Sequence, residues 1–402
     1  MKVEILKLDH YGRGITYLND KICFVENALP GEIVKIKVVK ETKKYLLGKV
    51  VDYFRLSDDR VDAACRYSDV CGGCNLEHLA IEAENSFKCL KVKEILKKFA
   101  DISSDVVYET NGLNEYGYRN KVTLHGDNNI LGYYEKSSNK IVAIDQCLLA
   151  DETINKMINV LNEMATTDNI EEALIRINNE CDEIMLSLKG KIDDYSRLSN
   201  LVDTLIVNDE VLLGEGSVIS SIGEKKYYVS TNSFFQVNKE LTKLLYDEVL
   251  NVVEKVKPKR VLDLYCGTGT IGIYISDLVD EVIGVDYSRS GIDDANRNKE
   301  LNNCCNVKFI CDKVENVISD FNNIDMVVVD PPRAGLDLKT VEHIKRIGSE
   351  TLVYISCDPV TLARDLKVLS VDYNVIAVKP YNMFPRTYHV ENVVLLCRKN
   401  VV

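Results

Sequence analysis

The chain has 402 residues, a length that predicts two or three domains rather than one core. Apolar residues make up 46% of it, and the net charge of -12 excludes a general attraction to nucleic acid, so only local patches could bind one. We expect a cytoplasmic protein without a membrane partner, because no signal peptide or long apolar run is present. Thirteen cysteines in such a chain favour free thiols, metal or cluster ligands and a nucleophile over disulfides.

The first segment, residues 1–55, consists of short alternating strands separated by turns. The turn at Pro30 and Gly31 and the period-2 apolar pattern after it predict a small antiparallel β-barrel. Residues 1–50 carry ten basic and six acidic residues, a surplus opposite in sign to the charge of the whole chain. Lysines that protect an edge strand explain this surplus, and so does a basic oligonucleotide-binding barrel.

The second segment, residues 56–232, is mixed. Helices are predicted near residues 80–100 and 152–164. We expect the first of them to pack on the domain formed by the third segment, residues 233–402. Aromatic-rich strands lie between these two helices.

The third segment, residues 233–402, alternates between strands and helices. A helix is predicted over 239–256, followed by six apolar strands and a seventh that closes the chain: 260–266, 281–287, 306–312, 324–330, 351–357, 374–384 and 392–398. Helical segments between the first six strands predict a parallel sheet covered on both faces. The seventh follows a short link without a helix and should run antiparallel.

Polar residues follow the predicted parallel strands, and ligands of such sheets bind beyond the strands' carboxyl ends. Gly267, Gly269 and Gly272 form a G-x-G-x-x-G turn after the first strand. Asp286 after the second strand is placed to accept ribose hydroxyls, which suits NAD as well as S-adenosylmethionine. Asp263 and Asp312 favour S-adenosylmethionine, because its sulfonium and amino groups prefer acidic surroundings.

The reaction is suggested by residues that follow the fourth and fifth strands. Arg333 stands after Asp330-Pro331-Pro332, where amine-directed methyltransferases have an aromatic residue, so methylation of a carbon atom is favoured. C5 of a pyrimidine becomes nucleophilic only when a thiolate adds at C6, and Cys357 is the candidate nucleophile. An antiparallel seventh strand would begin at the same edge of the sheet, where Glu391 and His389 are both candidates for the base.

Five segments together resemble the RNA uracil-5-methyltransferase family: SFFQVN, DLYCGTGT, VVVDPPRAGL, YISCDPVTLARDL and HVENVVLL. The resemblance implies an α/β fold, with a class I (Rossmann-like) methyltransferase domain of seven strands after a TRAM-like (OB-like) barrel and a mixed central domain. It implies Cys357 as nucleophile and Glu391 as proton acceptor. The implied contacts of S-adenosylmethionine are Gln236, Tyr265, Gly267, Asp286 and Asp330, to which we add Asp312 from its place at the rim.

Four cysteines and the first segment distinguish among members of this family. Cys65, Cys71 and Cys74, with Cys147, look like the 4Fe-4S site of the 23S ribosomal RNA branch, which also carries a TRAM domain. Zinc bound by the first three cysteines and His78 is the alternative. We expect 23S ribosomal RNA as substrate, a structural role for the cluster and a monomeric enzyme.

Two other functions remain open from the sequence. A transfer-RNA uridine-54 methyltransferase would use the same chemistry, and a non-catalytic RNA-binding protein would have no need of both Cys357 and Glu391. The target base must leave its stack, so aromatic side chains are candidates for RNA contacts: Phe234, Phe235, Tyr116, Tyr118, Tyr133 and Tyr134.

Overall fold

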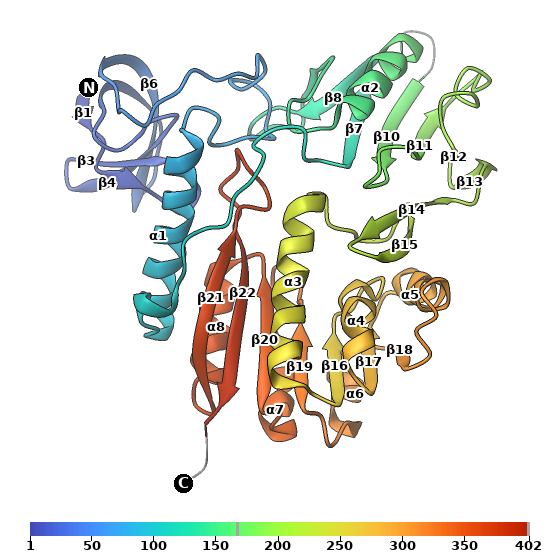
Figure 1. The fold of residues 1–402 in the computed structure, drawn as a ribbon. Coiled ribbons are helices and arrows are strands. Elements are labelled where there is room, and N and C mark those ends of the chain that lie inside the picture. The colour runs from blue at the N-terminus through green and yellow to red at the C-terminus, as the bar shows by residue number, and fades with distance from the viewer. Residues whose placement is uncertain (166–168, 400–402) are drawn as a thin grey trace.

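A computed structural model describes residues 1–165 and 169–399, which form four sheets. Figure 1 shows the N-terminal β-domain at the top of helix α1, a central sheet beside it, and the C-terminal sheet below both. None of the helices in the described ranges is long and apolar enough to cross a bilayer.

The N-terminal β-domain is a six-stranded sheet in the order β1-β5-β6-β4-β3-β2. Its strands are β1 (Lys2–Glu4), β2 (Lys7–Leu8), β3 (Gly14–Leu18), β4 (Lys21–Glu26), β5 (Ile33–Glu41) and β6 (Tyr45–Arg55). The prediction of purely antiparallel pairing is wrong in one place, because β4 and β6 run parallel. The side chains of Ile5, Val25, Val34 and Ile36 form its core, since one face of each strand points inward.

The central part contains a seven-stranded sheet in the order β13-β12-β11-β10-β7-β8-β9, and a separate hairpin of β14 and β15. Its elements are α1 (Ile81–Ala100), η1 (Ser104–Val106), β7 (Lys121–Asp127), β8 (Ile130–Tyr134), β9 (Ile141–Ala143), α2 (Glu152–Met164), β10 (Asn169–Ile177), β11 (Ile184–Lys191), β12 (Thr204–Val207), β13 (Glu210–Leu213), β14 (Ser217–Ile222) and β15 (Lys225–Ser230). Helix α2 places Ile154, Ile158 and Leu161 against the sheet.

The C-terminal part is a seven-stranded sheet in the order β18-β17-β16-β19-β20-β22-β21. Its elements are α3 (Lys239–Val256), β16 (Arg260–Leu264), α4 (Thr270–Ile275), η2 (Ser276–Leu278), β17 (Glu281–Asp286), α5 (Arg289–Leu301), β18 (Val307–Cys311), α6 (Val314–Val317), η3 (Ile318–Asp320), β19 (Met326–Val329), α7 (Leu338–Ile347), β20 (Thr351–Ser356), α8 (Pro359–Leu369), β21 (Tyr373–Tyr381) and β22 (Glu391–Arg398).

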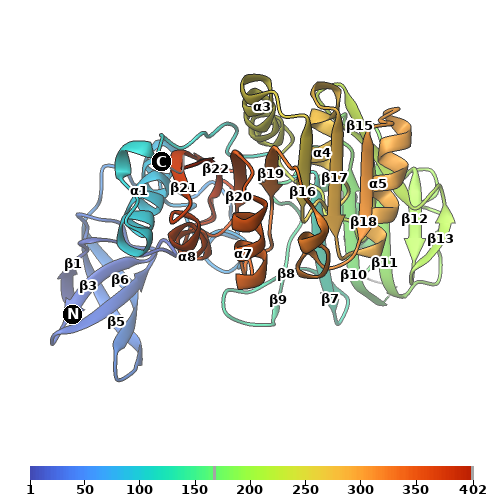
Figure 2. The ribbon, with the colours of Figure 1, turned by 90° about the horizontal axis from the view of Figure 1, so that it is seen from below.

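Helices cover both faces of this sheet, as the alternating strand and helix pattern predicted (Figure 2). Leu262 of β16 belongs to a core that includes α1, α7 and α8, whereas its neighbour Val261 packs with α3 and α4 on the other face. Helix α1 thus completes the core of a sheet that begins 160 residues later in the chain. Its Val92, Ile95 and Leu96 are buried there.

The last strand enters the sheet between β20 and β21 and runs antiparallel to both, which confirms the predicted direction. Ser356 is opposite Asn392, so the residue after β20 and the first residue of β22 meet at one edge. The carboxyl ends of the parallel strands β16 to β20 lie at the same edge. The connection of residues 382–390, here called the β21–β22 loop, therefore delivers Glu391 to the ligand edge.

Candidate active site

The glycine turn after β16 is held by two carboxylates of the sheet. Gly267 and Gly269 have φ values of 54° and 75°, and Tyr265, the residue in front of the turn, also has a left-handed φ of 63°. The N–H of Gly267 donates to Asp286 (3.0 Å), and the N–H of Gly272 donates to Asp263 (3.0 Å). No side-chain or backbone atom lies within 4 Å of where a Cβ of residue 267 would be, so the turn leaves open space for a ligand.

Asp263 differs from the other acids in its surroundings. It is fully buried, and burial raises its pKa to about 8, with Asp330 and Asp286 adding to the effect. The sequence argument placed Asp263 with the acids that attract a cationic ligand. In the structure it supports the turn from within the sheet.

Asp286 and Asp312 lie on neighbouring strands, and their backbones are joined by the hydrogen bond from the Asp312 N–H to the Asp286 carbonyl (3.0 Å). Asp286 also accepts the N–H of Ser288 (2.7 Å), so each of its oxygens already has one donor. A carboxylate oxygen has two lone pairs, which leaves Asp286 able to accept ligand hydroxyls.

The loop before α3 turns Phe234 outward and Phe235 inward. Phe234 is 68% exposed, whereas Phe235 is 4% exposed and packs near Tyr227. Gln236 is buried, and its carbonyl accepts a hydrogen bond from Asn120 of the central part (3.3 Å). Of the aromatic candidates for RNA contacts, Phe234 is therefore the most accessible, while Tyr118 is buried as well.

Cys357 and Glu391 are brought to neighbouring positions, as the register of β20 and β22 requires. Burial raises the pKa of the Cys357 thiol to about 12, and the Glu391 carboxyl adds to this effect. Glu391 is 4% exposed, and its pKa is raised well above the usual range, first by burial and then by Asp330. The pKa of Asp330 is raised by burial too. The three groups form one site in which negative charge is costly.

Arg333 brings a positive charge to this site. Its charge offsets part of the rise in the pKa values of Cys357 and Glu391, and its Nη2 lies 3.4 Å from Nε2 of His389. Burial, followed by Arg333, lowers the pKa of His389 to about 4. A group with so low a pKa is a weak proton acceptor at neutral pH, which favours Glu391 over His389 as the base.

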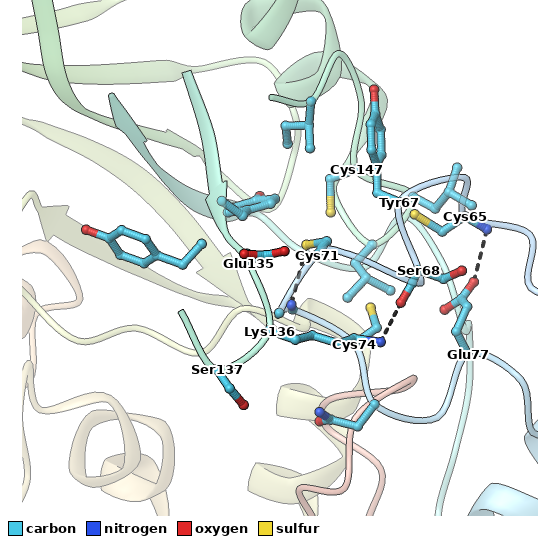
Figure 3. Close-up of a pocket in the computed structure, with 18 of the residues that line it drawn as sticks. Cys65, Tyr67, Ser68, Cys71, Cys74, Glu77, Glu135, Lys136, Ser137 and Cys147 are labelled. Atoms are coloured by element: carbon cyan, nitrogen blue, oxygen red, sulfur yellow. Dashed lines mark hydrogen bonds between the residues drawn. The ribbon is translucent and has the colours of Figure 1, made fainter. Parts of the chain in front are cut away.

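A cavity of about 620 Å³ is lined by all four cysteines of the predicted cluster site and by Tyr388 of the β21–β22 loop. Figure 3 shows Cys65, Cys71 and Cys74 from the loop before α1, with Cys147 from the segment after β9. His78 lines a neighbouring, smaller cavity with Cys74 instead. Within residues 1–165 and 169–399, no group of three or more His, Cys, Asp and Glu side chains is arranged to hold a metal ion.

The raised pKa of Cys357 leads to a prediction about its reactivity in the protein without ligands. At pH 8, iodoacetamide should modify Cys357 roughly a hundredfold more slowly than the exposed Cys305, because only a thiolate reacts. The rate at Cys357 should still be rising at the most alkaline pH at which the protein stays folded. Peptide mass spectrometry at several times and pH values measures both sites in one sample, and equal rates at pH 8 would contradict the assigned environment.

Comparison with known proteins gives the family of the chain. Residues 81–399 match the model of the tRNA (uracil-5-)-methyltransferase family, and residues 1–51 match the TRAM domain. A protein of Halalkalibacterium halodurans described as an uncharacterised RNA methyltransferase is 33% identical, over 100% of this chain and 97% of its own length. One from Clostridium tetani with the same description is 32% identical, over 96% and 93%.

A solved structure is similar along nearly the whole chain. The tRNA (uracil-54, C5)-methyltransferase of Pyrococcus abyssi, in complex with S-adenosyl-L-homocysteine, has a TM-score of 0.81 and 28% identity, and the match covers 98% of this chain and 100% of that one. The extent of the family match and the likeness over the full fold lead to one conclusion. The chain belongs to the tRNA (uracil-5-)-methyltransferase family, whose members are S-adenosylmethionine-dependent RNA methyltransferases.

Proposed function

We propose that this protein transfers the methyl group of S-adenosylmethionine to C5 of a uridine in 23S ribosomal RNA, through a covalent adduct of Cys357 with C6 of the base. The observation that carries the proposal is the pairing of β20 with β22, which puts a thiol and a carboxyl side by side at the edge where the glycine turn lies. An RNA substrate of this kind is found in the cytoplasm.

The proposed reaction has four steps. The thiolate of Cys357 adds to C6, and the electron pair of the C5–C6 double bond moves into the enolate of the base. C5 then attacks the methyl carbon, and S-adenosylhomocysteine leaves with the electrons of the broken carbon–sulfur bond. Glu391 removes the proton of C5, and the electrons left behind expel the sulfur of Cys357 and restore the double bond.

The electrostatics of the site suit this order. A thiol with a pKa of about 12 is almost fully protonated at neutral pH, so attack requires a change that favours the thiolate. The sulfonium of S-adenosylmethionine is a positive charge that would enter next to the acidic rim and stabilise the thiolate. Glu391 has to be ionised to accept the C5 proton, and the raised pKa makes its carboxylate, once formed, a stronger base than an ordinary one.

The proposed cofactor contacts are distributed along the carboxyl ends of four strands and the loop before α3: Gln236, Tyr265, Gly267, Asp286, Asp312 and Asp330. The hydrogen bond between Gly267 and Asp286 fixes the turn against the strand, and the open space above Gly267 admits the ligand. The acids of this set suit the cationic end of S-adenosylmethionine.

RNA binding is supported by the TRAM segment and by exposed aromatic side chains near the site. Residues 1–50 carry the local basic surplus noted above, so they are suited to phosphates. Phe234 is two residues from Gln236 and is 68% exposed, so we propose that it stacks on an unpaired base next to the target uridine.

Two RNA substrates have to be distinguished. The four-cysteine set and the TRAM segment look like the ribosomal branch of the family and favour 23S ribosomal RNA. The Pyrococcus enzyme, whose similarity includes the N-terminal segment, acts on uridine 54 of tRNA, and it makes tRNA the second candidate. A TRAM segment alone therefore does not decide between the two.

We expect methyl transfer from labelled S-adenosylmethionine to fragments of 23S ribosomal RNA and not to tRNA. Mapping of the labelled nucleotide identifies the uridine. Label in uridine 54 of tRNA and none in ribosomal fragments would replace the preferred substrate with the second candidate. Label in neither RNA would contradict both.

The four cysteines are proposed to hold a 4Fe-4S cluster. All four thiols line one cavity. Four soft sulfur donors suit an iron–sulfur cluster. Each sulfur would bind a different iron atom of the cluster, so the four sulfurs need not point at a single ion. The position of His78 in the neighbouring cavity disfavours zinc bound by three cysteines and a histidine. Such a cluster would tie the loop of Cys65–Cys74 to Cys147, and the proposed methylation needs no electron transfer from it.

Protein purified without oxygen should contain iron and sulfide in roughly four atoms each per chain and absorb visible light. Cys74→Ser should lose both, whereas Cys305→Ser, which changes an exposed cysteine of the methyltransferase part, should keep them. A colourless protein that contains one zinc would contradict the cluster.

RNA with 5-fluorouridine at the target position tests the nucleophile and the base. The wild-type enzyme should be trapped as a stable adduct, because C5 carries fluorine instead of a removable proton. Cys357→Ala should form no adduct. Glu391→Gln should accumulate the methylated adduct with ordinary RNA, because elimination stalls. Activity of Cys357→Ala equal to that of the wild type would disprove the mechanism, and denaturing gels measure each species.

A further inference from the structure

The β21–β22 loop, residues 382–390, is mostly buried although it connects two strands at a ligand edge. Asn382 and Met383 are fully buried, and Arg386 and Val390 are 4% and 1% exposed. Glu391 directly follows this loop, so the path of the loop decides where the carboxylate of the proposed base lies. The groups that fix it come from parts of the chain about 300 residues away.

A buried ion pair on α1 contacts the start of the loop. Glu84 and Lys88 are one helical turn apart, their side chains are fully buried, and Nζ lies 2.8 Å from Oε1. Lys88 also donates to the side-chain oxygen of Asn382 and to the carbonyl of Phe384 (3.2 Å). Asn382 in turn donates to Glu84 (2.9 Å). Charges are costly to bury, and here they are satisfied by the loop.

Arg386 joins the same pair to the cysteine-rich segment. Its N–H donates to both oxygens of Glu84, at 3.1 Å each. Its carbonyl accepts the N–H groups of Asn75 (2.9 Å) and Leu76 (3.0 Å), which directly follow Cys74. Arg386 has a φ of 67°, a left-handed conformation that is unfavourable for a residue other than glycine, so these contacts have to hold it.

The Arg386 side chain adds two further ties. Nη1 donates to the carbonyl of Leu79 (2.6 Å), and Nη2 is paired with Glu115. The guanidinium carbon lies 5.2 Å from the ring centre of Tyr116. Arg386 thus contacts three separate segments that precede the central sheet in the chain: residues 75–79, Glu84 of α1 and residues 115–116.

From these contacts we propose that Glu84, Lys88 and Arg386 are positioning residues, which hold the β21–β22 loop so that the carboxylate of Glu391 meets the C5 proton of the adduct. The proposal rests on the roles proposed above for Cys357 and Glu391. In this proposal, none of the three residues touches the reacting atoms of the enzyme or the substrate.

A change in the loop should affect resolution of the adduct, which needs Glu391, and not its formation, which needs Cys357. Cys357 follows β20, which is hydrogen-bonded on both sides, and it lies next to Asp358, the N-cap of α8. Its supports from β19 and α8 do not involve the loop, whereas Glu391 pairs with Tyr381, directly in front of the loop. Glu391 is the first residue after the loop, so a loosened loop should displace the base and leave the nucleophile in place.

The test separates formation of the adduct from its resolution. The double variant Glu84→Gln/Lys88→Met removes both buried charges and keeps the side-chain lengths. Trapping by 5-fluorouridine RNA should stay within about twofold of wild type, and resolution of the methylated adduct on ordinary RNA should slow by at least about tenfold, so that the adduct accumulates. Rapid quench followed by denaturing gels measures both rates.

Lys97→Met is the matched control. Lys97 of α1 and the C-cap residue Asp101 also form an i,i+4 ion pair, but the lysine side chain is 61% exposed. This variant should match wild type in both rates. Arg386→Gly is a second variant, for use if the double variant does not fold. Glycine adopts the left-handed backbone of residue 386 without strain, and the change removes the guanidinium. It should show the same selective delay in resolution of the adduct.

Two results would overturn the proposal. Equal losses in trapping and resolution would mean that the three residues support only the fold, and unchanged resolution in a folded variant would mean that the loop needs no support. A failure of the proposed function would look different, because wild type would then not be trapped and Glu391→Gln would not accumulate an adduct.

Discussion

The antiparallel pairing of β22 with β20 is the constraint on which the site depends. A parallel sheet presents only the carboxyl ends of its strands at the ligand edge. Reversal of one interior strand brings an amino end to that edge, and with it Glu391 beside Cys357. Glu391 is buried and Cys357 is half-buried, next to carboxyls whose pKa values are raised. A cationic methyl donor and an uncharged nucleobase therefore suit the space better than an anionic ligand.

The β21–β22 loop is also where the N-terminal parts of the molecule meet. Tyr388 contacts Tyr11 of the β-domain edge to face, with ring centres 5.3 Å apart. Its carbonyl accepts a hydrogen bond from Lys91 of α1 (2.8 Å), and the cysteine-rich segment reaches the loop through Arg386. The β-domain, α1 and the cysteine-rich segment are therefore all in direct contact with the strand connection that leads to Glu391.

Much of this was predictable because local patterns determine it. Helices 152–164 and 239–256 agree with the structure, since their apolar periodicity is strong, and so do the buried strands of the C-terminal sheet. The parallel pairing of β4 with β6 was missed, because register between distant strands leaves no local signal. Glu84 and Lys88 have the i,i+4 spacing of an ordinary surface ion pair. They are a buried ion pair only because the β21–β22 loop, about 300 residues later in the chain, packs over them.

The interior place of β22 has a consequence for synthesis of the chain. Until residues 391–398 have left the ribosome, β20 keeps one unpaired side, and β21 has only the isolated bridges of Val378 with Val107 and of Tyr381 with Asn111 among the described residues. Every residue of β20 is buried in the finished sheet, so the nascent chain exposes an apolar strand with free hydrogen-bonding groups. The nascent chain is therefore prone to aggregate until β22 has docked, and Glu391 reaches the ligand edge only in that step.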